Sequence, residues 1–220
     1  KRFYFLPDVT HTDLPNERSA LAQRIAQESA GRKIVFLGGT IVKSKNLTAW
    51  FRLIALADPR QWYFVQVGEI RWDELDAQEL QALRAAMESP RGNLLVHDAY
   101  LPDERTFNEI LMASDMIFAV YRDFRMSSNM LGKAAAFEKP ILVADNHLMG
   151  ARVIRYGIGM AVPQDDPEAM LLALTQLADP LHACTGFHAY REDFGHHELA
   201  ARLDEMINHC CDTSPGEVAA

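Results

Sequence analysis

Three consecutive residues that can serve an anion site, Ser127, Ser128 and Asn129, stand directly before a run of small residues over 130–137. The small-residue run predicts a helix, and a serine or asparagine at a helix start caps the first turn with its side-chain oxygen. The remaining first-turn N–H groups then point outward and carry the positive end of the helix dipole. This segment is therefore predicted to bind a phosphate group.

The elements around this turn alternate between apolar strand-like runs and helical patterns. Strands are predicted over 33–38, 62–68, 93–97, 116–121, 141–144 and 159–162. Helices are predicted over 47–57, 72–88, 103–114, 130–137 and 166–178, the last with the N-cap and first-turn proline of Asp166-Pro167. Continuous apolar strands alternating with helices predict an α/β fold: a Rossmann-like parallel sheet of about six strands with helices on both faces.

Ligands of such sheets bind beyond the carboxyl ends of the strands. The segments that follow the predicted strands are therefore the expected functional positions: Gly39-Thr40, Gly68-Glu69, 97–100 and 122–129. Two ends fall outside the alternation. Residues 1–30 are expected to be a linker with a helix over 15–29, 31–186 the Rossmann-like domain, and 187–220 a terminal helix over 196–209 with a disordered tail from 213.

The composition excludes several classes of protein. With 220 residues, 49% hydrophobic and 24% charged, the chain can bury a globular core. A net charge of −8 argues against nucleic-acid binding, and no apolar run reaches the length of a membrane span. The three cysteines, Cys184, Cys210 and Cys211, form a poor disulfide framework, which favours a reducing compartment. Their spacing with the nearby histidines matches no closed zinc pattern, so no metal site is predicted.

Residues 33–178 resemble the C-terminal, nucleotide-sugar-binding half of a two-domain glycosyltransferase of the GT-B fold, of the group 1 or family 4-like kind found in bacteria. The likeness rests on the glycine-led loop over 39–47, the glycine-ended strand at Gly68, and the polar turn with its helix and Lys139-Pro140. It implies that Lys45, with Thr40 and the Gly39 backbone, faces the diphosphate of the donor. The alternative for Lys45 is an ordinary solvated loop lysine.

The resemblance also assigns the loop after the third predicted strand to the nucleobase. His97 and Tyr100 are the side chains there that could stack on a base. Equally, Tyr100 could be a packing residue and His97 a histidine whose hydrogen bonds are satisfied at the end of a strand. Both interpretations remain open on the sequence.

The family pattern is broken at its acidic positions. Retaining members have two glutamates eight positions apart, one near the transferred sugar and one on the donor ribose, whereas Arg125 and Lys133 stand there in this register, and Arg152 replaces a further glutamate. A lysine cannot accept hydrogen bonds from ribose hydroxyls. Either the basic residues contact phosphate instead, with Lys133 reaching the diphosphate, or the domain has lost donor binding.

The resemblance implies a glycosyltransferase of polysaccharide or glycoconjugate biosynthesis that uses a UDP- or GDP-sugar and no metal or other cofactor. A preceding N-terminal domain is expected to bring the glycan or lipid-linked acceptor, so that this segment alone is inactive and its catalytic residues stay unassigned. The full protein is expected in the cytoplasm, with peripheral association at the inner face of the membrane. The alternative function is a non-catalytic nucleotide-binding or scaffolding domain in a glycan-assembly complex. A flavodoxin-like sensory domain is a third reading, but such domains need aspartates where Gly39-Thr40 stands.

Overall fold

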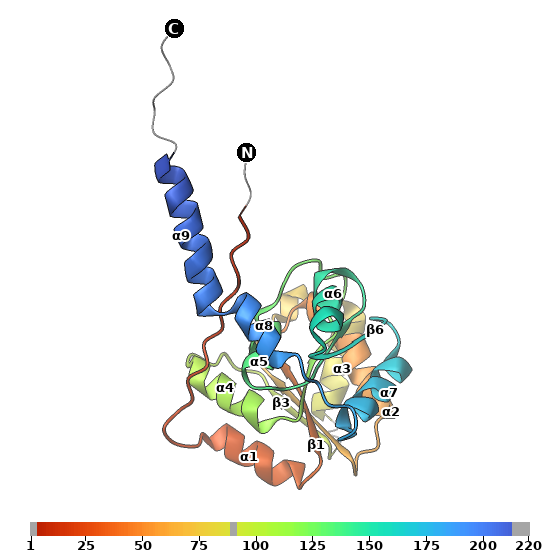
Figure 1. Ribbon diagram of the computed structural model, residues 1–220. Helices are drawn as coiled ribbons and strands as arrows, with labels where there is room; N and C mark the ends of the chain where they lie inside the picture. The colour runs from red at the N-terminus through yellow and green to blue at the C-terminus, as the bar shows by residue number, and fades with distance from the viewer. Residues whose placement is uncertain (1–3, 89–91, 213–220) are drawn as a thin grey trace.

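A computed structural model of the chain describes residues 4–88 and 92–212 (Figure 1). Its strands are β1 (Lys33–Gly38), β2 (Trp62–Val67), β3 (Leu94–His97), β4 (Met116–Ala119), β5 (Ile141–Ala144) and β6 (Gly159–Val162). They form a six-stranded sheet in the order β3-β2-β1-β4-β5-β6, and every neighbouring pair is parallel. The predicted α/β class is confirmed. The order of the strands reverses between β1 and β4, where ligands of doubly wound sheets bind.

Helices cover both faces of the sheet. Their bounds are α1 (Ala20–Ser29), α2 (Leu47–Leu56), α3 (Ala77–Glu88), α4 (Glu104–Ala113), α5 (Asn129–Ala136), α6 (His147–Tyr156), α7 (Pro167–Ala178), α8 (Phe187–Phe194) and α9 (His196–Asp212), with short 3-10 turns η1 (Lys43–Lys45) and η2 (Trp72–Glu74). Residues of α2, α3 and α7 share one hydrophobic cluster, and residues of α1, α4, α5, α6 and α8 share the other (Figure 1). No helix in the described part of the chain is long and apolar enough to cross a membrane.

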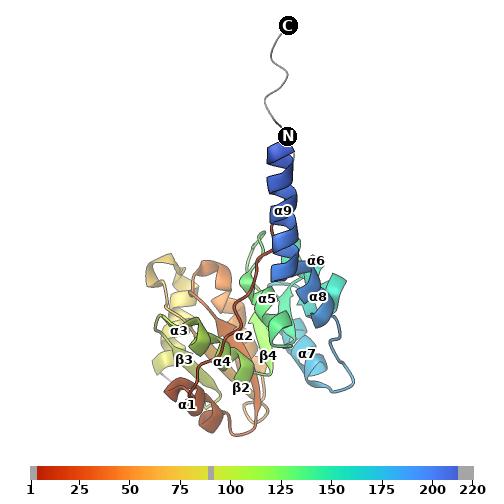
Figure 2. The ribbon, with the colours of Figure 1, turned by 60° about the vertical axis from the view of Figure 1, so that its left-hand side comes forward.

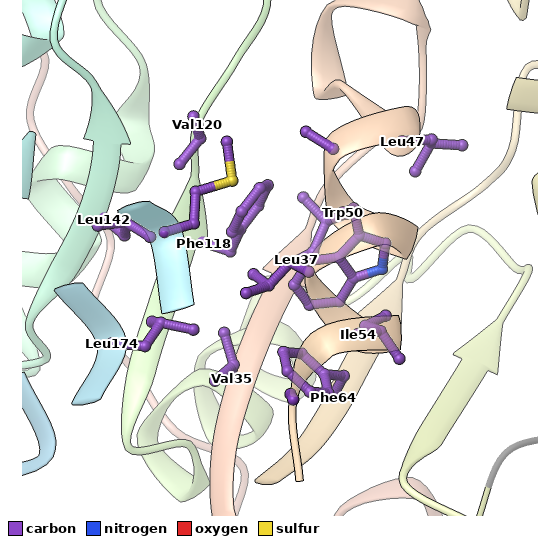
Figure 3. Packing of buried hydrophobic residues seen from close by; sticks show 14 of the residues in the cluster. Val35, Leu37, Leu47, Trp50, Ile54, Phe64, Phe118, Val120, Leu142 and Leu174 are labelled. Carbon is purple, nitrogen blue, oxygen red and sulfur yellow. The ribbon is translucent and has the colours of Figure 1, made fainter. Parts of the chain in front are cut away.

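The strands divide their side chains between these two clusters. Val35 and Leu37 of β1 point to the α2 side, whereas Phe36 points to the other side, where its ring lies 5.3 Å from that of Phe107. Trp50 of α2 is fully buried, 5.3 Å from Phe64 and 4.9 Å from Phe118 between ring centroids (Figure 3). Burial on both faces explains why the strands read as continuous apolar runs instead of alternating ones.

Several predicted boundaries need correction. The helix predicted over 72–88 is two elements, because η2 ends at Glu74 and α3 begins at Ala77. The helix predicted over 15–29 begins only at Ala20, where Ser19 caps it by accepting a hydrogen bond from the N–H of Ala22. Helices α6 and α8 were not predicted. The tail predicted to be disordered from 213 lies outside the described residues.

The segment before α1, residues 4–15, is named here the strap. Both views show it leaving the domain on the same side as α9 (Figures 1 and 2). Ring contacts join the strap to α9 and to α8: the centroids of Tyr4 and His209 of α9 are 6.4 Å apart, and those of Phe5 and Phe194 of α8 are 5.9 Å apart. Further along, the strap is hydrogen-bonded to Asn108 of α4 and to Asn129 and Lys133 of α5. Its assignment as a linker after another domain stays a prediction.

Candidate functional site

A cavity of about 350 Å³ lies at the carboxyl end of the sheet, near the point where the strand order reverses. Its walls come from the loops after β1, β2 and β3, from the first turn of α4 and from the start of α5. The lining residues are Gly38, Gly39, Thr40, Lys45, Gly68, Glu69, Tyr100, Leu101, Pro102, Glu104, Phe107, Ser128, Asn129, Met130 and Lys133. The position agrees with the rule for parallel sheets.

Two glycines form a bare stretch of backbone in this wall. Gly39 has φ +88° and Gly68 has φ +146°, both in the region that favours glycine. A Cβ atom on Gly68 would lie 2.0 Å from the carbonyl oxygen of Gly39, so no side chain fits between the two loops. The two loops run side by side beyond these glycines, where the N–H of Ile41 donates to Glu69 O at 2.9 Å. A ligand can therefore approach the backbone here without meeting a side chain.

Lys45 presents a positive charge beside this stretch. Its Nζ donates to Gly38 O and to the Tyr121 hydroxyl, both at 2.8 Å, and lies 4.4 Å from the centre of the Tyr121 ring. The side chain is half-buried in the cavity wall. An ammonium has three N–H donors. Within the described chain two of these donors have partners, so the third remains for a bound anion.

Asn46 fixes the turn that carries Lys45. It is fully buried and adopts φ 59°, which asparagine tolerates better than most residues. Its amide nitrogen donates to Val120 O at 3.2 Å and to Gln164 O at 2.8 Å, and its amide oxygen accepts from Arg122 at 3.1 Å. The turn η1 is thereby attached to the end of β4. This attachment holds Lys45 at the junction of β1 and β4.

The start of α5 supplies the second anion-binding feature, as predicted from its polar turn. Ser128 is the N-cap, and its hydroxyl accepts from the N–H of Met130 at 3.3 Å. Asn129 is exposed and accepts a hydrogen bond from the Thr10 hydroxyl of the strap at 2.8 Å. Ala134 and Ala135 are fully buried, so the helix lies close to the sheet. Its N-terminus opens on the cavity that contains Lys45.

Lys133 also reaches the cavity, but its ammonium is already bonded within the protein. The side chain is 1% exposed. Its Nζ donates to His11 O at 2.9 Å and to the side-chain oxygen of Asn108, and it forms an ion pair with Glu104. These three partners use the three donors of the ammonium. To contact a diphosphate, Lys133 would have to give up one of them.

The remaining predicted residues divide into two groups. Thr40 and Tyr100 line the cavity, and Tyr100 is 70% exposed. His97, Arg125 and Ser127 do not line it. Arg125 is exposed, and the Ser127 hydroxyl accepts from Arg152 at 2.6 Å. Binding roles for these three side chains stay predictions without support from the cavity geometry.

The predicted set left out part of the cavity wall. Gly68 and Glu69 follow β2 and were noted as a functional position, although no role was given to them. Glu104 and Phe107 come from α4, whose sequence shows only an amphipathic helix with an acidic first turn. Nothing in their sequence context marks them as cavity residues. Across the described residues, no group of three His, Cys, Asp or Glu side chains could hold a metal ion.

Comparison with known proteins identifies the fold. No family model and no curated protein matches the sequence. Among solved structures, sucrose-phosphate synthase from Thermosynechococcus elongatus is 17% identical with a TM-score of 0.75, and the match covers 97% of this chain and 53% of that one. The C-terminal domain of a group 1 glycosyl transferase from Francisella tularensis is 13% identical with a TM-score of 0.61, covering 82% of this chain and 94% of that domain.

A third structure, described as trehalose-6-phosphate from E. coli bound with UDP-2-fluoro glucose, is 16% identical with a TM-score of 0.57. The match covers 94% of this chain and 48% of that one. The chain thus spans about half the length of two of these three structures. At these identities the likeness concerns the fold. The chain has the Rossmann-like fold of one domain of the GT-B glycosyltransferases.

Proposed function

We propose that this chain binds a nucleoside-diphosphate sugar in the cavity and is the donor-binding domain of a glycosyltransferase of polysaccharide or glycoconjugate biosynthesis. The observation that carries the proposal is the half-buried ammonium of Lys45, placed beside bare glycine backbone in the same cavity as the start of α5. An ammonium and a helix N-terminus both favour a phosphate group. The structural neighbour bound with UDP-2-fluoro glucose supports this ligand class.

The charges of the cavity wall favour one orientation of the donor. The diphosphate would lie against Lys45, the Gly39 backbone and the N-terminus of α5, with the hydroxyl of Thr40 as a further donor. Tyr100 would then offer its exposed ring to the base, which aromatic side chains bind by stacking. UDP and GDP sugars are both candidates.

The chemical contribution of this domain would be electrostatic. As the bond between the sugar and the diphosphate breaks, negative charge builds on the departing diphosphate, and fixed positive groups stabilise that charge. Lys45 and the start of α5 are such groups. The acceptor, a glycan or a lipid-linked saccharide, would be brought by another part of the full protein, which we place in the cytoplasm at the inner face of the membrane.

Calorimetric titration with UDP, GDP, ADP and their sugars tests donor binding directly. We expect selective binding of a diphosphate, weakened about ten- to a hundredfold in Lys45→Ala, because a hydrogen bond to a charged group contributes about 1.5–3 kcal/mol. Lys43→Ala is the matched control, since Lys43 is an exposed lysine of the same turn that does not line the cavity. Equal affinity of Lys45→Ala and the parent chain would contradict the proposal, as would the absence of binding by every nucleotide.

A second candidate is a nucleotide-binding domain that takes no part in catalysis. It is favoured by the state of Lys133, which stands at an acidic position of the family pattern and has its donors occupied inside the protein. Binding of a nucleotide sugar by the full-length protein, without transfer to any glycan or lipid-linked acceptor and without hydrolysis, would support this candidate. Transfer of the sugar would exclude it.

A further inference from the structure

Glu104 places a carboxylate in the cavity wall, and this carboxylate has no part in the proposed phosphate-binding site. It is the first residue of α4, lines the cavity, and its side chain is 48% exposed. Its one partner among the described residues is the ammonium of Lys133, which contacts Oε1. The second carboxylate oxygen therefore keeps its lone pairs for a ligand. An ionised carboxylate accepts hydrogen bonds and donates none.

The ion pair between Lys133 and Glu104 is held in place by the other hydrogen bonds of Lys133. Lys133 is 1% exposed and is bonded to His11 O and to Asn108, which is itself fully buried. The amide nitrogen of Asn108 in turn donates to His11 O at 3.2 Å and to Asp13 O at 2.8 Å. The strap, α4 and α5 thus fix one oxygen of the Glu104 carboxylate. A carboxylate fixed in this way is a preorganised acceptor, which costs less to order when a ligand binds.

The charges of the cavity restrict the ligand group that Glu104 can face. A carboxylate repels phosphate, so the diphosphate belongs beside Lys45 and the start of α5. The groups that a carboxylate binds well are those with two neighbouring donors, such as the adjacent hydroxyls of a sugar. A nucleoside-diphosphate sugar carries such a pair on its ribose and others on its transferred sugar.

We infer that Glu104, held by Lys133, accepts hydrogen bonds from a pair of adjacent hydroxyls of the bound donor and so makes the cavity selective for ribonucleotides over 2′-deoxyribonucleotides. This inference rests on the proposed function, because it assumes that a nucleotide occupies the cavity. It assigns to Lys133 the positioning of an acceptor instead of direct contact with phosphate.

The test compares the affinities of UDP, GDP and ADP with those of their 2′-deoxy counterparts by calorimetry. We expect the deoxy form of whichever nucleotide binds to be about ten- to a hundredfold weaker, since a site that pairs with a hydroxyl leaves a polar group unpaired when the hydroxyl is absent. In Glu104→Gln the ratio should fall severalfold, because the amide keeps only one acceptor oxygen, carries no charge and loses the ion pair with Lys133. Glu69→Gln removes the other carboxylate of the cavity wall and should leave the ratio as in the parent chain.

Each outcome separates the inference from the proposed function. Binding that depends on Lys45 but does not distinguish ribo from deoxy forms overturns the role of Glu104 and leaves donor binding intact. If Glu104→Gln changes only the preference among bases, Glu104 reads the base and the inference is wrong. If the deoxy penalty is absent but UDP-glucose binds more tightly than UDP only when Glu104 is present, the hydroxyls belong to the transferred sugar and selectivity for ribose is refuted. The absence of any nucleotide binding overturns both proposals.

The comparison does not depend on the variant being fully stable. The ratio of ribo to deoxy affinity is taken within one protein, so a loss of folded Glu104→Gln lowers both titrations alike. Should that variant not fold, the ratio in the parent chain still decides, because a value of one refutes a hydroxyl acceptor in the cavity.

Discussion

The two lysines of the cavity wall show how the same residue type takes different roles at the scale of single residues. Lys45 has two of its three N–H donors bonded within the described chain, and Lys133 has all three. Both were predicted from the sequence to bind the donor. Only the identity of their neighbours, which come from distant parts of the chain, distinguishes a lysine that can receive an anion from one that positions Glu104.

Gly68→Ala is predicted to destabilise the chain and to disturb the cavity. The added Cβ would stand 2.0 Å from the backbone oxygen of Gly39, and φ at this position is +146°. Strain of this kind costs about 1–3 kcal/mol. The free energy of unfolding in urea should fall by that amount, whereas Gly92→Ala, where the added atom meets nothing within 4 Å, should be nearly neutral. A neutral Gly68→Ala would show that the two loops can separate.

At the scale of elements, the starts of the helices are encoded locally to different degrees. Helix α3 begins with a reciprocal capping box: the Asp76 carboxylate accepts from the Glu79 N–H at 2.9 Å, and Glu79 accepts from the Asp76 N–H at 3.2 Å. Helix α6 has no such signal. Its N-cap, Asn146, makes no capping bond, and its fourth residue, Gly150, is a weak helix former. A glycine is needed there because a Cβ atom would lie 2.6 Å from Ala144 O. For this reason α6 escaped prediction.

The capping box gives a pH-dependent prediction. Glu79 is fully buried, and desolvation raises the pKa of its carboxyl above the usual value near 4.5. The folded chain therefore binds this proton more tightly than the unfolded chain, so the contribution of Glu79 to stability grows as pH falls through its folded pKa and is smallest at neutral and higher pH. Glu79→Gln keeps an acceptor and removes the charge.

Urea unfolding of both proteins between pH 4.5 and pH 8 measures this effect. The stability of Glu79→Gln relative to the parent should be more favourable at pH 8 than at pH 4.5. Glu88→Gln is a control on the same helix, because Glu88 is exposed at the other end of α3. A constant difference across the pH range would show that the Glu79 carboxyl titrates alike in the folded and unfolded chain.

At the scale of the whole molecule, the strap and the segment leading into α1 are held by buried polar side chains from the domain. Asn108 is fully buried and donates to His11 O and Asp13 O, while Glu109, 9% exposed, accepts from the N–H of Ser19 through both carboxylate oxygens. Lys133 contacts the same stretch of the strap. Since buried polar groups must be paired, these residues make the strap a part of the folded domain.

Asn108→Ala is predicted to lower the free energy of unfolding by about 2–3 kcal/mol. It removes the partner of two strap carbonyls and of the buried Lys133 ammonium, and unpaired buried groups cost about 1–3 kcal/mol each. Asn16→Ala, at an exposed position near α1, should change stability by less than about 0.5 kcal/mol. Faster hydrogen exchange of the strap in Asn108→Ala would confirm the cause, and unchanged exchange there would contradict it.

The sequence by itself determined the architecture, because the two periodicities that define strands and helices are local. The apolar run of β1, the capped start of α7 at Asp166 and the polar turn before α5 were all predicted and are present. The expectation that ligand-binding residues follow the strands also depends only on the fold class. It indicated the loop at Gly39-Thr40 and the start of α5 as parts of one site, and the family resemblance added Lys45.

Only the tertiary structure decided how the charges of that site are paired. Glu104 lies 29 positions from Lys133 in the sequence, and His11 lies 122 positions from it. No local pattern encodes contacts of this range, because they arise from the packing of the strap, α4 and α5 against one another. The physical reason is the cost of burying an ammonium without partners. Lys133 is therefore paired with acceptors from two distant segments, the strap and α4, and the second carboxylate oxygen of Glu104 is left for a ligand in the cavity.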